Sequence, residues 1–139
     1  MERNGGCLCG RVRYKALGNP SGGVVYCHCD DCKKQTSAAY SIVAGYERES
    51  VVFDDVSELK TYESVGDSGM KVRRSFCGNC GSPLYSEAEA LPGRVIIKAG
   101  SFDDMSWLKP IAEIYTKDKV ACANIDSNID SYEASRPRK

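Results

Sequence analysis

Eight cysteines in a chain of 139 residues constrain this sequence more than any other feature. Seven of them fall into three tight clusters and one stands alone: Cys7 with Cys9, then Cys27, Cys29 and Cys32, then Cys77 with Cys80, and finally Cys122. The N-terminus lacks the apolar stretch of a secretory signal, so we expect a cytoplasmic protein. Clustered cysteines in that compartment bind metal more often than they form disulfides. The sequence therefore predicts a small fold organised around metal ions.

The first and third clusters together offer four thiolates, enough for a closed tetrahedral zinc site. Cys7 and Cys9 are separated by one residue, and alternate residues of an extended segment point to the same face. Cys77 and Cys80 have the two-residue gap of a zinc knuckle, and the glycines of CGNCG (77–81) suit its tight turns. We expect a structural site that ties the N-terminal strand to the middle of the chain. The alternative, a redox dithiol at Cys77 and Cys80, would need a βαβ context that the sequence lacks.

The middle cluster has three cysteines and predicts a metal with an open coordination position. Cys27 and Cys29 share a strand face by the same alternation, and Cys32 follows one turn later. Alternation points His28, the single histidine of the chain, to the opposite face. We expect His28 to be a buried, hydrogen-bonded core residue rather than a proton shuttle. Three protein ligands with one open position are typical of catalytic zinc, and that position can hold water or the sulfur of a small thiol.

Other interpretations of the middle cluster stay open. Cys122 could fold back and complete a second four-cysteine site. Asp30 and Asp31 could also reach the metal, although carboxylates match it less well beside three soft thiolates. A fully closed second site would favour a non-catalytic, zinc-stabilised protein-interaction module. Reversible oxidation of the cluster would instead favour a redox or zinc sensor.

Short β-rich segments separated by turn signals make up most of the chain. We expect strands in nine segments: 11–16, 23–29, 38–45, 51–53, 59–64, 71–76, 83–87, 94–100 and 112–116. Helix is expected only over 30–36 and 127–135. The sequence thus predicts one mainly β domain over residues 1–139, with a frayed tail at 136–139.

Composition argues against two classes of partner. Lysine plus arginine and aspartate plus glutamate both number 19, so there is no basic excess to bind nucleic acid. No stretch approaches the ~20 apolar residues of a membrane-spanning helix. We therefore expect neither nucleic acid nor a membrane as partner.

Four motifs give the chain a resemblance to a known family: GGCLCGRVRY (5–14), YCHCDDCKKQTSAAY (26–40), FCGNCGSPLY (76–85), and KAGSFDD (98–104) with the Trp, Lys-Pro and AEIYT that follow it. Together they resemble the glutathione-dependent formaldehyde-activating enzyme family, which includes the centromere protein V-like proteins. The resemblance extends from Gly5 to about Ser131. Two positions depart from the family pattern: Ser37 stands where many members carry glycine, and Cys122 where an aromatic residue is common. The chain is also shorter than formaldehyde-activating members of the family.

The resemblance implies a β-tent of small antiparallel sheets with little helix, carrying two zinc ions. It assigns the four outer cysteines to a structural zinc. It assigns Cys27, Cys29 and Cys32 to a catalytic zinc, which a small-molecule thiol such as glutathione engages. The implied reaction joins glutathione to formaldehyde as S-(hydroxymethyl)glutathione, which is carbon–sulfur lyase chemistry in reverse.

Glutathione carries two carboxylates and one ammonium, so its site needs a cation or backbone N–H groups near the metal. Lys33, Lys34 and Gln35 directly follow the third cysteine of the middle cluster and are candidates, together with Ser37. The alternative for the two lysines is a solvated pair on a short helical turn. Farther along the chain, we expect the aromatic residues of SFDDMSW (101–107) to anchor the core rather than to bind a ligand.

Overall fold

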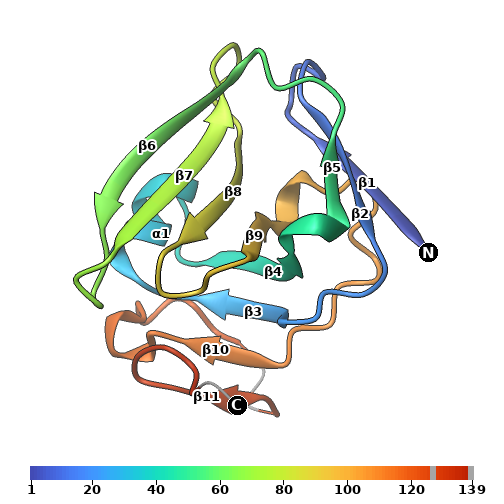
Figure 1. The fold of residues 1–139 in the computed structure, drawn as a ribbon. Coiled ribbons are helices and arrows are strands. Elements are labelled where there is room, and N and C mark those ends of the chain that lie inside the picture. Colours follow the sequence, from blue (N-terminus) through green and yellow to red (C-terminus); the bar gives the residue numbers. More distant parts are fainter. Residues whose placement is uncertain (126–127, 138–139) are drawn as a thin grey trace.

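The strands of this chain form two sheets (Figure 1). The computed structural model describes residues 1–125 and 128–137. Within them the strands are β1 (Glu2–Gly6), β2 (Arg13–Leu17), β3 (Gly23–Cys27), β4 (Ser41–Glu47), β5 (Val51–Phe53), β6 (Leu59–Val65), β7 (Lys71–Cys77), β8 (Pro83–Ala88), β9 (Arg94–Lys98), β10 (Ala112–Ile114) and β11 (Asp130–Ser131). The helix α1 (Asp30–Thr36) and the short 3-10 turns η1 (Arg48–Ser50), η2 (Ala99–Ser101) and η3 (Thr116–Asp118) connect them. The mainly β class is confirmed.

The small sheet has the order β1-β2-β5, and the large one has the order β11-β10-β3-β4-β9-β8-β7-β6. Figure 1 shows the β6–β7–β8 end of the large sheet and the small sheet on opposite sides of the fold, with β3, β4 and β10 at the base. All nine segments expected as strands overlap an observed strand. The sequence did not indicate β1, because its Asn-Gly-Gly run has low β propensity. Gly5 is needed there because an added Cβ would collide with the Tyr14 ring.

Two expectations about the C-terminal part of the chain are wrong. The sheets are not purely antiparallel, because β10 pairs in parallel with both β3 and β11. The helix expected over 127–135 does not form: Asp130–Ser131 is the strand β11, and residue 127 lies outside the described residues. The side of β10 that faces away from β3 accounts for the strand β11, since it offers backbone groups such as the Glu113 carbonyl, which accepts from Tyr132 N–H at 3.0 Å.

Arg136 was expected in a frayed tail, but its Nη2 donates to the Gly22 carbonyl at 2.7 Å. The last two residues of that expected tail, 138–139, lie outside the described residues. The C-terminal segment is therefore held against the start of β3 as far as Arg136.

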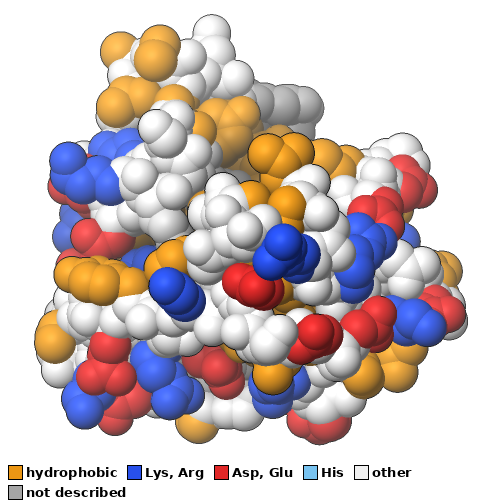
Figure 2. All heavy atoms as spheres, turned by 90° about the horizontal axis from the view of Figure 1, so that it is seen from above, with side chains coloured by type: hydrophobic (Ala, Val, Ile, Leu, Met, Phe, Trp, Pro, Cys, Tyr) orange, Lys and Arg blue, Asp and Glu red, His pale blue; other side chains and the backbone are white. Residues whose placement is uncertain are grey.

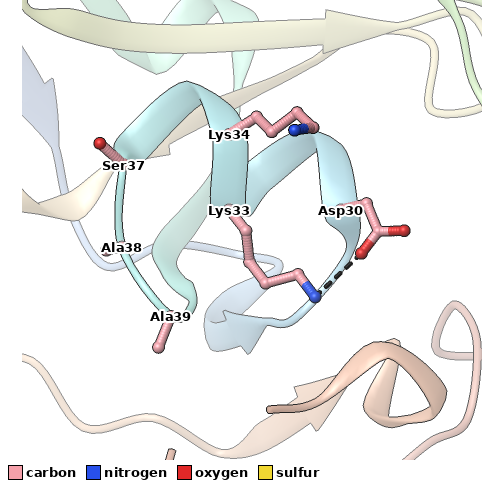
Figure 3. Close-up of a pocket in the computed structure, with 6 residues that line it drawn as sticks. All are labelled: Asp30, Lys33, Lys34, Ser37, Ala38 and Ala39. Carbon is pink, nitrogen blue, oxygen red and sulfur yellow. Dashed lines mark ion pairs between the residues drawn. The ribbon is translucent and has the colours of Figure 1, made fainter.

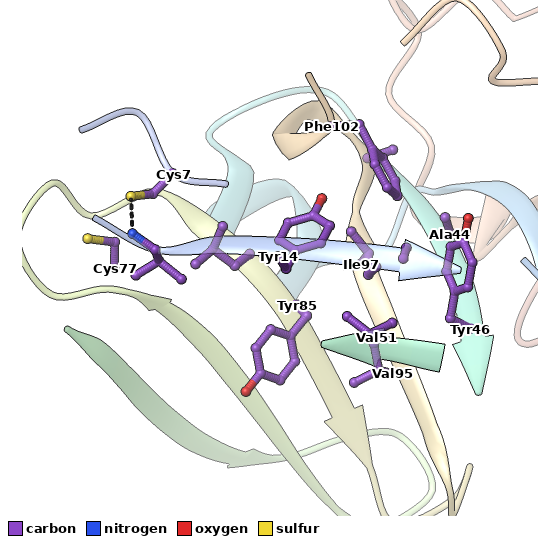
Figure 4. Close-up of a cluster of buried hydrophobic side chains, with 14 of the residues drawn as sticks. Cys7, Tyr14, Ala44, Tyr46, Val51, Cys77, Tyr85, Val95, Ile97 and Phe102 are labelled. Carbon is purple, nitrogen blue, oxygen red and sulfur yellow. Dashed lines mark hydrogen bonds between the residues drawn. The ribbon is translucent and has the colours of Figure 1, made fainter. Parts of the chain in front are cut away.

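The main core lies between one face of the large sheet and the small sheet (Figure 4). It joins Tyr14 and Val51 of the small sheet to Tyr46, Val95 and Ile97 of the large one. Each of these side chains is at most 3 % exposed. The other face of the large sheet is therefore left to carry a second, smaller cluster and the helix α1.

Phe102 and Trp107 anchor the core, as the sequence predicted. Phe102 is buried, and Trp107 packs edge-on against it with ring centroids 5.0 Å apart. The Arg3 guanidinium lies 3.8 Å from the centroid of the Trp107 ring, which holds β1 against this turn.

Charges of both signs are interspersed on the surface. On the face that Figure 2 shows, lysine and arginine side chains alternate with aspartate and glutamate instead of forming one basic field. Among the residues that the structure describes, no helix has the length and apolar character needed to cross a membrane.

Candidate metal centres

Four cysteine sulfurs from distant parts of the chain meet at the first centre. The Sγ atoms of Cys7, Cys9, Cys77 and Cys80 all lie within 4.8 Å of one another. The Cys7 and Cys9 sulfurs are 3.6 Å apart, and those of Cys9 and Cys77 are 3.8 Å apart. A tetrahedral zinc with Zn–S bonds of about 2.3 Å places its sulfurs about 3.8 Å apart, so this donor set fits zinc.

Two similar turns present these sulfurs, and neither cysteine pair lies along a strand. The expectation that Cys7 and Cys9 share a strand face is wrong, because β1 ends at Gly6 and Gly10 N–H closes a turn on the Cys7 carbonyl at 3.1 Å. In the second turn Gly81 N–H donates to the Cys77 carbonyl at 2.7 Å. The glycine that ends each turn has a positive φ, +82° in the first and +81° in the second, which favours glycine.

Gly78 has a different role from the turn that the sequence suggested. Its φ is not in the left-handed region, but an added Cβ would lie 3.0 Å from the Glu58 carbonyl oxygen and closer still to the Lys60 side chain. The residue must therefore be small because the chain before β6 passes over it.

Polar groups around the first centre favour the thiolate form of Cys9 and Cys80, whereas, against backbone hydrogen bonds from Cys80 and Asn79, burial raises the pKa of Cys77 to about 11. Val12 N–H points to the Cys7 sulfur at 3.3 Å. The hydroxyl of Ser82 lies 3.2 Å from the Cys80 sulfur, and with the Ser82 backbone N–H it lowers the pKa of that thiol to about 5. The Asn79 side chain similarly lowers the pKa of Cys9. Metal binding requires thiolates, so this environment suits a bound cation.

The second centre lies where β3 runs into α1. The sulfurs of Cys27, Cys29 and Cys32 lie within 4.8 Å of one another. Cys27 is the last residue of β3, whereas Cys29 lies beyond the strand and caps α1, accepting from Cys32 N–H at 3.3 Å. Strand alternation therefore does not explain the convergence, which results from the strand-to-helix junction. The helix expected at 30–36 is present as α1.

The three thiols of the second centre cannot all ionise without a cation. Hydrogen bonds with Cys27 and Cys29 lower the pKa of Cys32 well below its ordinary value. Hydrogen bonds with Cys29 and Cys32, reinforced by burial, raise the pKa of Cys27 far above its own. The close approach of the three sulfurs therefore opposes the ionisation of more than one of them, and a divalent cation would relieve that repulsion.

Two cations that sequence reasoning missed face this cluster. The Lys98 ammonium is 3.7 Å from the Cys32 sulfur and 3.2 Å from the Ser41 hydroxyl, and the residue is 5 % exposed. The Arg74 side chain is 12 % exposed and lies 3.7 Å from an Asp31 carboxylate oxygen. The one available signal was Lys98 at the end of the buried strand RVIIK, where a charged residue is out of place.

His28 is the buried core residue that alternation predicted. It is fully buried, and its Nε2 lies 3.0 Å from Oε1 of Glu113 on β10. Glu113 also accepts from Ser131 at 3.0 Å and pairs with Lys119 at 3.2 Å. Burial lowers the pKa of His28 and keeps the ring neutral. Burial alone would raise the pKa of Glu113, but its hydrogen bonds to Lys119, Ser131 and His28 lower it.

The residues that follow Cys32 separate into different environments. Lys33 is not a solvated lysine: its ammonium donates to the Asp118 carbonyl at 2.6 Å and pairs with Asp30 at 2.9 Å, which fixes α1 to η3. An open pocket of about 750 Å³ lies over this helix. Figure 3 shows the six residues that line it: Asp30, Lys33, Lys34, Ser37, Ala38 and Ala39. Gln35 does not line it, and its amide oxygen is buried without a hydrogen-bond partner.

Ser37 ends α1 in the left-handed conformation, with φ 55° and ψ 42°. Glycine adopts this conformation at little cost, whereas a residue with a Cβ is strained in it. Cys122 is exposed and belongs to neither cluster, so in the described part of the chain no fourth cysteine joins the second centre.

Comparison with known proteins agrees with this geometry. The model of the family described as glutathione-dependent formaldehyde-activating enzyme matches residues 2–118, which include the cysteines of both centres. The chain belongs to this family.

No curated protein matches the chain. A crystal structure of a Rhodobacter sphaeroides protein, a Northeast Structural Genomics target, is similar in fold, with a TM-score of 0.58 at 15 % sequence identity. The match covers 93 % of this chain and 98 % of the other. The fold of this formaldehyde-activating family member therefore recurs in a protein with little sequence similarity.

Proposed function

We propose that this chain is a zinc enzyme that condenses glutathione with formaldehyde to S-(hydroxymethyl)glutathione. The observation that supports it best is the second centre, where three cysteine sulfurs converge and no fourth cysteine joins them in the described residues. Membership of the formaldehyde-activating family supports the choice of substrates. The first centre has a full set of four sulfurs, which suits a structural role.

The proposed reaction balances without an oxidant or a reductant. The glutathione sulfur forms a bond to the formaldehyde carbon, the C=O π electrons move to the oxygen, and that oxygen receives the proton that the thiol gives up. Zinc held by Cys27, Cys29 and Cys32 would supply Lewis acidity, which keeps a thiol ionised at neutral pH. Lys34 and Ser37 line the open pocket over α1, the helix that carries Cys32, and can hold glutathione carboxylates by charge and hydrogen bonding. Lys33 contributes less, because Asp30 and the Asp118 carbonyl already occupy its ammonium.

The test is the rate of hydroxymethyl exchange between formaldehyde and glutathione, followed by NMR exchange spectroscopy above the uncatalysed background. The zinc-loaded protein should accelerate exchange, and Cys29→Ser should abolish the acceleration. Cys122→Ser is the matched control, because it makes the same replacement at an exposed cysteine outside both clusters and should leave the rate unchanged. A fully zinc-loaded protein that leaves the exchange rate at background would refute the proposal.

A further inference from the structure

Lys98 is a buried cation whose nearest anionic partner is sulfur. Its ammonium contacts the Cys32 sulfur at 3.7 Å and the Ser41 hydroxyl at 3.2 Å. No carboxylate lies within ion-pair distance of it in residues 1–125 and 128–137. A buried ammonium is costly unless a negative charge compensates it. The thiolates of the second centre are the available compensation.

Strand register brings Lys98 to the same face of the large sheet as the second centre. Lys98 lies opposite Val43, Ser41 is two residues from Val43 on β4, and Ser41 lies opposite Cys27. Residues directly opposite share a face, and so do residues two apart on one strand. The lysine is therefore placed by the backbone of three adjacent strands, not by a mobile loop.

Arg74 reaches the same face along the other side of β9. Arg74 lies opposite Ser86, Ser86 lies opposite Ile96, and Ile96 is two residues from Lys98. The Arg74 guanidinium is held by the Ser64 hydroxyl at 2.9 Å and, more loosely, by Asp31 at 3.7 Å. Lys98 and Arg74 thus bring two positively charged side chains to the face of the large sheet that carries the second centre. The field at this centre therefore favours negative charge.

Charge counting shows which fourth ligand this field favours. Three thiolates with one divalent cation carry a single net negative charge. A neutral fourth ligand leaves that charge unchanged, whereas an anionic ligand doubles it. A buried ammonium beside the sulfurs therefore stabilises the anionic complex more than the neutral one.

We propose that Lys98 is a specificity-determining positioning residue, which makes the Cys27–Cys29–Cys32 centre prefer an anionic fourth ligand, a thiolate, over a neutral one. The preference for an anionic ligand follows from the charges alone, and only the choice of a thiolate as that ligand rests on the proposed function. The proposal assigns a role to a residue outside the cysteine motifs.

The experiment uses full-length protein loaded with Co²⁺, whose visible absorption reports a change of ligand at the metal. Dissociation constants are measured at one fixed pH for glutathione, for azide as an anion without sulfur, and for imidazole as a neutral ligand. Lys98→Met should raise the dissociation constants of glutathione and azide about tenfold or more. The dissociation constant of imidazole should stay within about twofold of its original value. Lys98→Arg, which keeps the charge, should retain most of the anion preference.

The other outcomes overturn one idea or the other. An equal rise in the dissociation constants of all three ligands, or no change in any of them, refutes the role of Lys98 in selectivity. A further outcome concerns metal content. If Lys98→Met and Lys98→Gln both bind fewer than two metal ions per chain while Lys98→Arg binds two, the lysine is structural and the proposal also fails. If glutathione does not bind the unaltered protein but azide selectivity still depends on Lys98, the proposed function fails and this inference stands.

Discussion

Replacing Glu113 with alanine should destabilise the metal-loaded protein by about 3 kcal/mol, because this carboxylate joins β10, β3 and β11. It contacts His28 at 3.0 Å, Lys119 at 3.2 Å and Ser131 at 3.0 Å. Alanine leaves the fully buried His28 Nε2 without a partner, which costs about 2 kcal/mol. The ion pair to Lys119 is worth under about 1 kcal/mol because that lysine is 31 % exposed. Ser131 is exposed and can turn to water, so its bond adds about 0.5 kcal/mol.

Glu113→Gln separates the hydrogen bonds from the charge. The amide oxygen can still accept from His28 or Ser131, so the cost should fall to about 1 kcal/mol. The assay is equilibrium urea unfolding followed by circular dichroism at a buffered free zinc concentration, because metal binding is coupled to folding. A cost for alanine no larger than that for glutamine, or below about 1 kcal/mol, would refute the claim that Glu113 satisfies His28.

The pH dependence of this penalty tests the charge of His28. The pKa of Glu113 is lowered in the folded protein, so its contribution is fully present above the unfolded pKa of roughly 4.3 and is lost only as pH falls through the folded value. Burial also lowers the pKa of His28, which favours the neutral ring. The penalty of Glu113→Gln should therefore be flat from pH 6 to pH 8. A penalty that grows toward pH 6 would show an imidazolium–carboxylate pair instead.

Three further substitutions test other parts of the structure. Ser37→Gly should raise stability by about 0.5–1 kcal/mol, because it relieves a left-handed residue at the end of α1; an unchanged or lower melting temperature would contradict this. Cys122→Ser should keep two zinc ions per chain by atomic absorption, and loss of one would place Cys122 in a metal site. Phe102→Ala should cost about 3–5 kcal/mol in urea unfolding, since the ring is buried among Tyr14, Tyr46 and Trp107; a cost below about 1 kcal/mol would mean that the core collapses around the gap.

The sequence predicted the two cysteine pairs and the group of three because their signal was local, and it joined the two pairs because a closed zinc site needs four ligands. Cysteines two or three positions apart lie close together in almost any backbone conformation, so each group was predicted correctly even where the assumed conformation was wrong. Cys7 and Cys9 occupy a turn instead of a strand, and Cys29 caps a helix. His28 was placed correctly because the residue after Cys27 faces away from the cluster.

The residues that sequence reasoning missed depend on strand register. Lys98 ends the strand RVIIK and Glu113 is the one charged residue of AEI, and no local pattern tells which cysteine or histidine lies close to either of them. Their positions follow from pairing β9 with β4, and β10 with β3, across long stretches of chain. The parallel pairing of β10 was missed for the same reason, since the sequence of a short strand does not indicate whether it pairs in parallel or antiparallel.

The two groups of cysteines close loops of very different length, so metal binding at each has a different effect on folding. Cys27, Cys29 and Cys32 lie within six consecutive residues, whereas the outer four extend over residues 7–80. Bringing the ends of the longer loop together costs roughly 2 kcal/mol more of chain entropy, at about 0.6 kcal/mol for each doubling of length. The unfolded chain therefore keeps part of its affinity for metal at the inner cluster, and free zinc favours the folded state mainly through the outer one. During synthesis, the inner cluster can capture metal once residue 32 has emerged, while the outer one waits for residue 80.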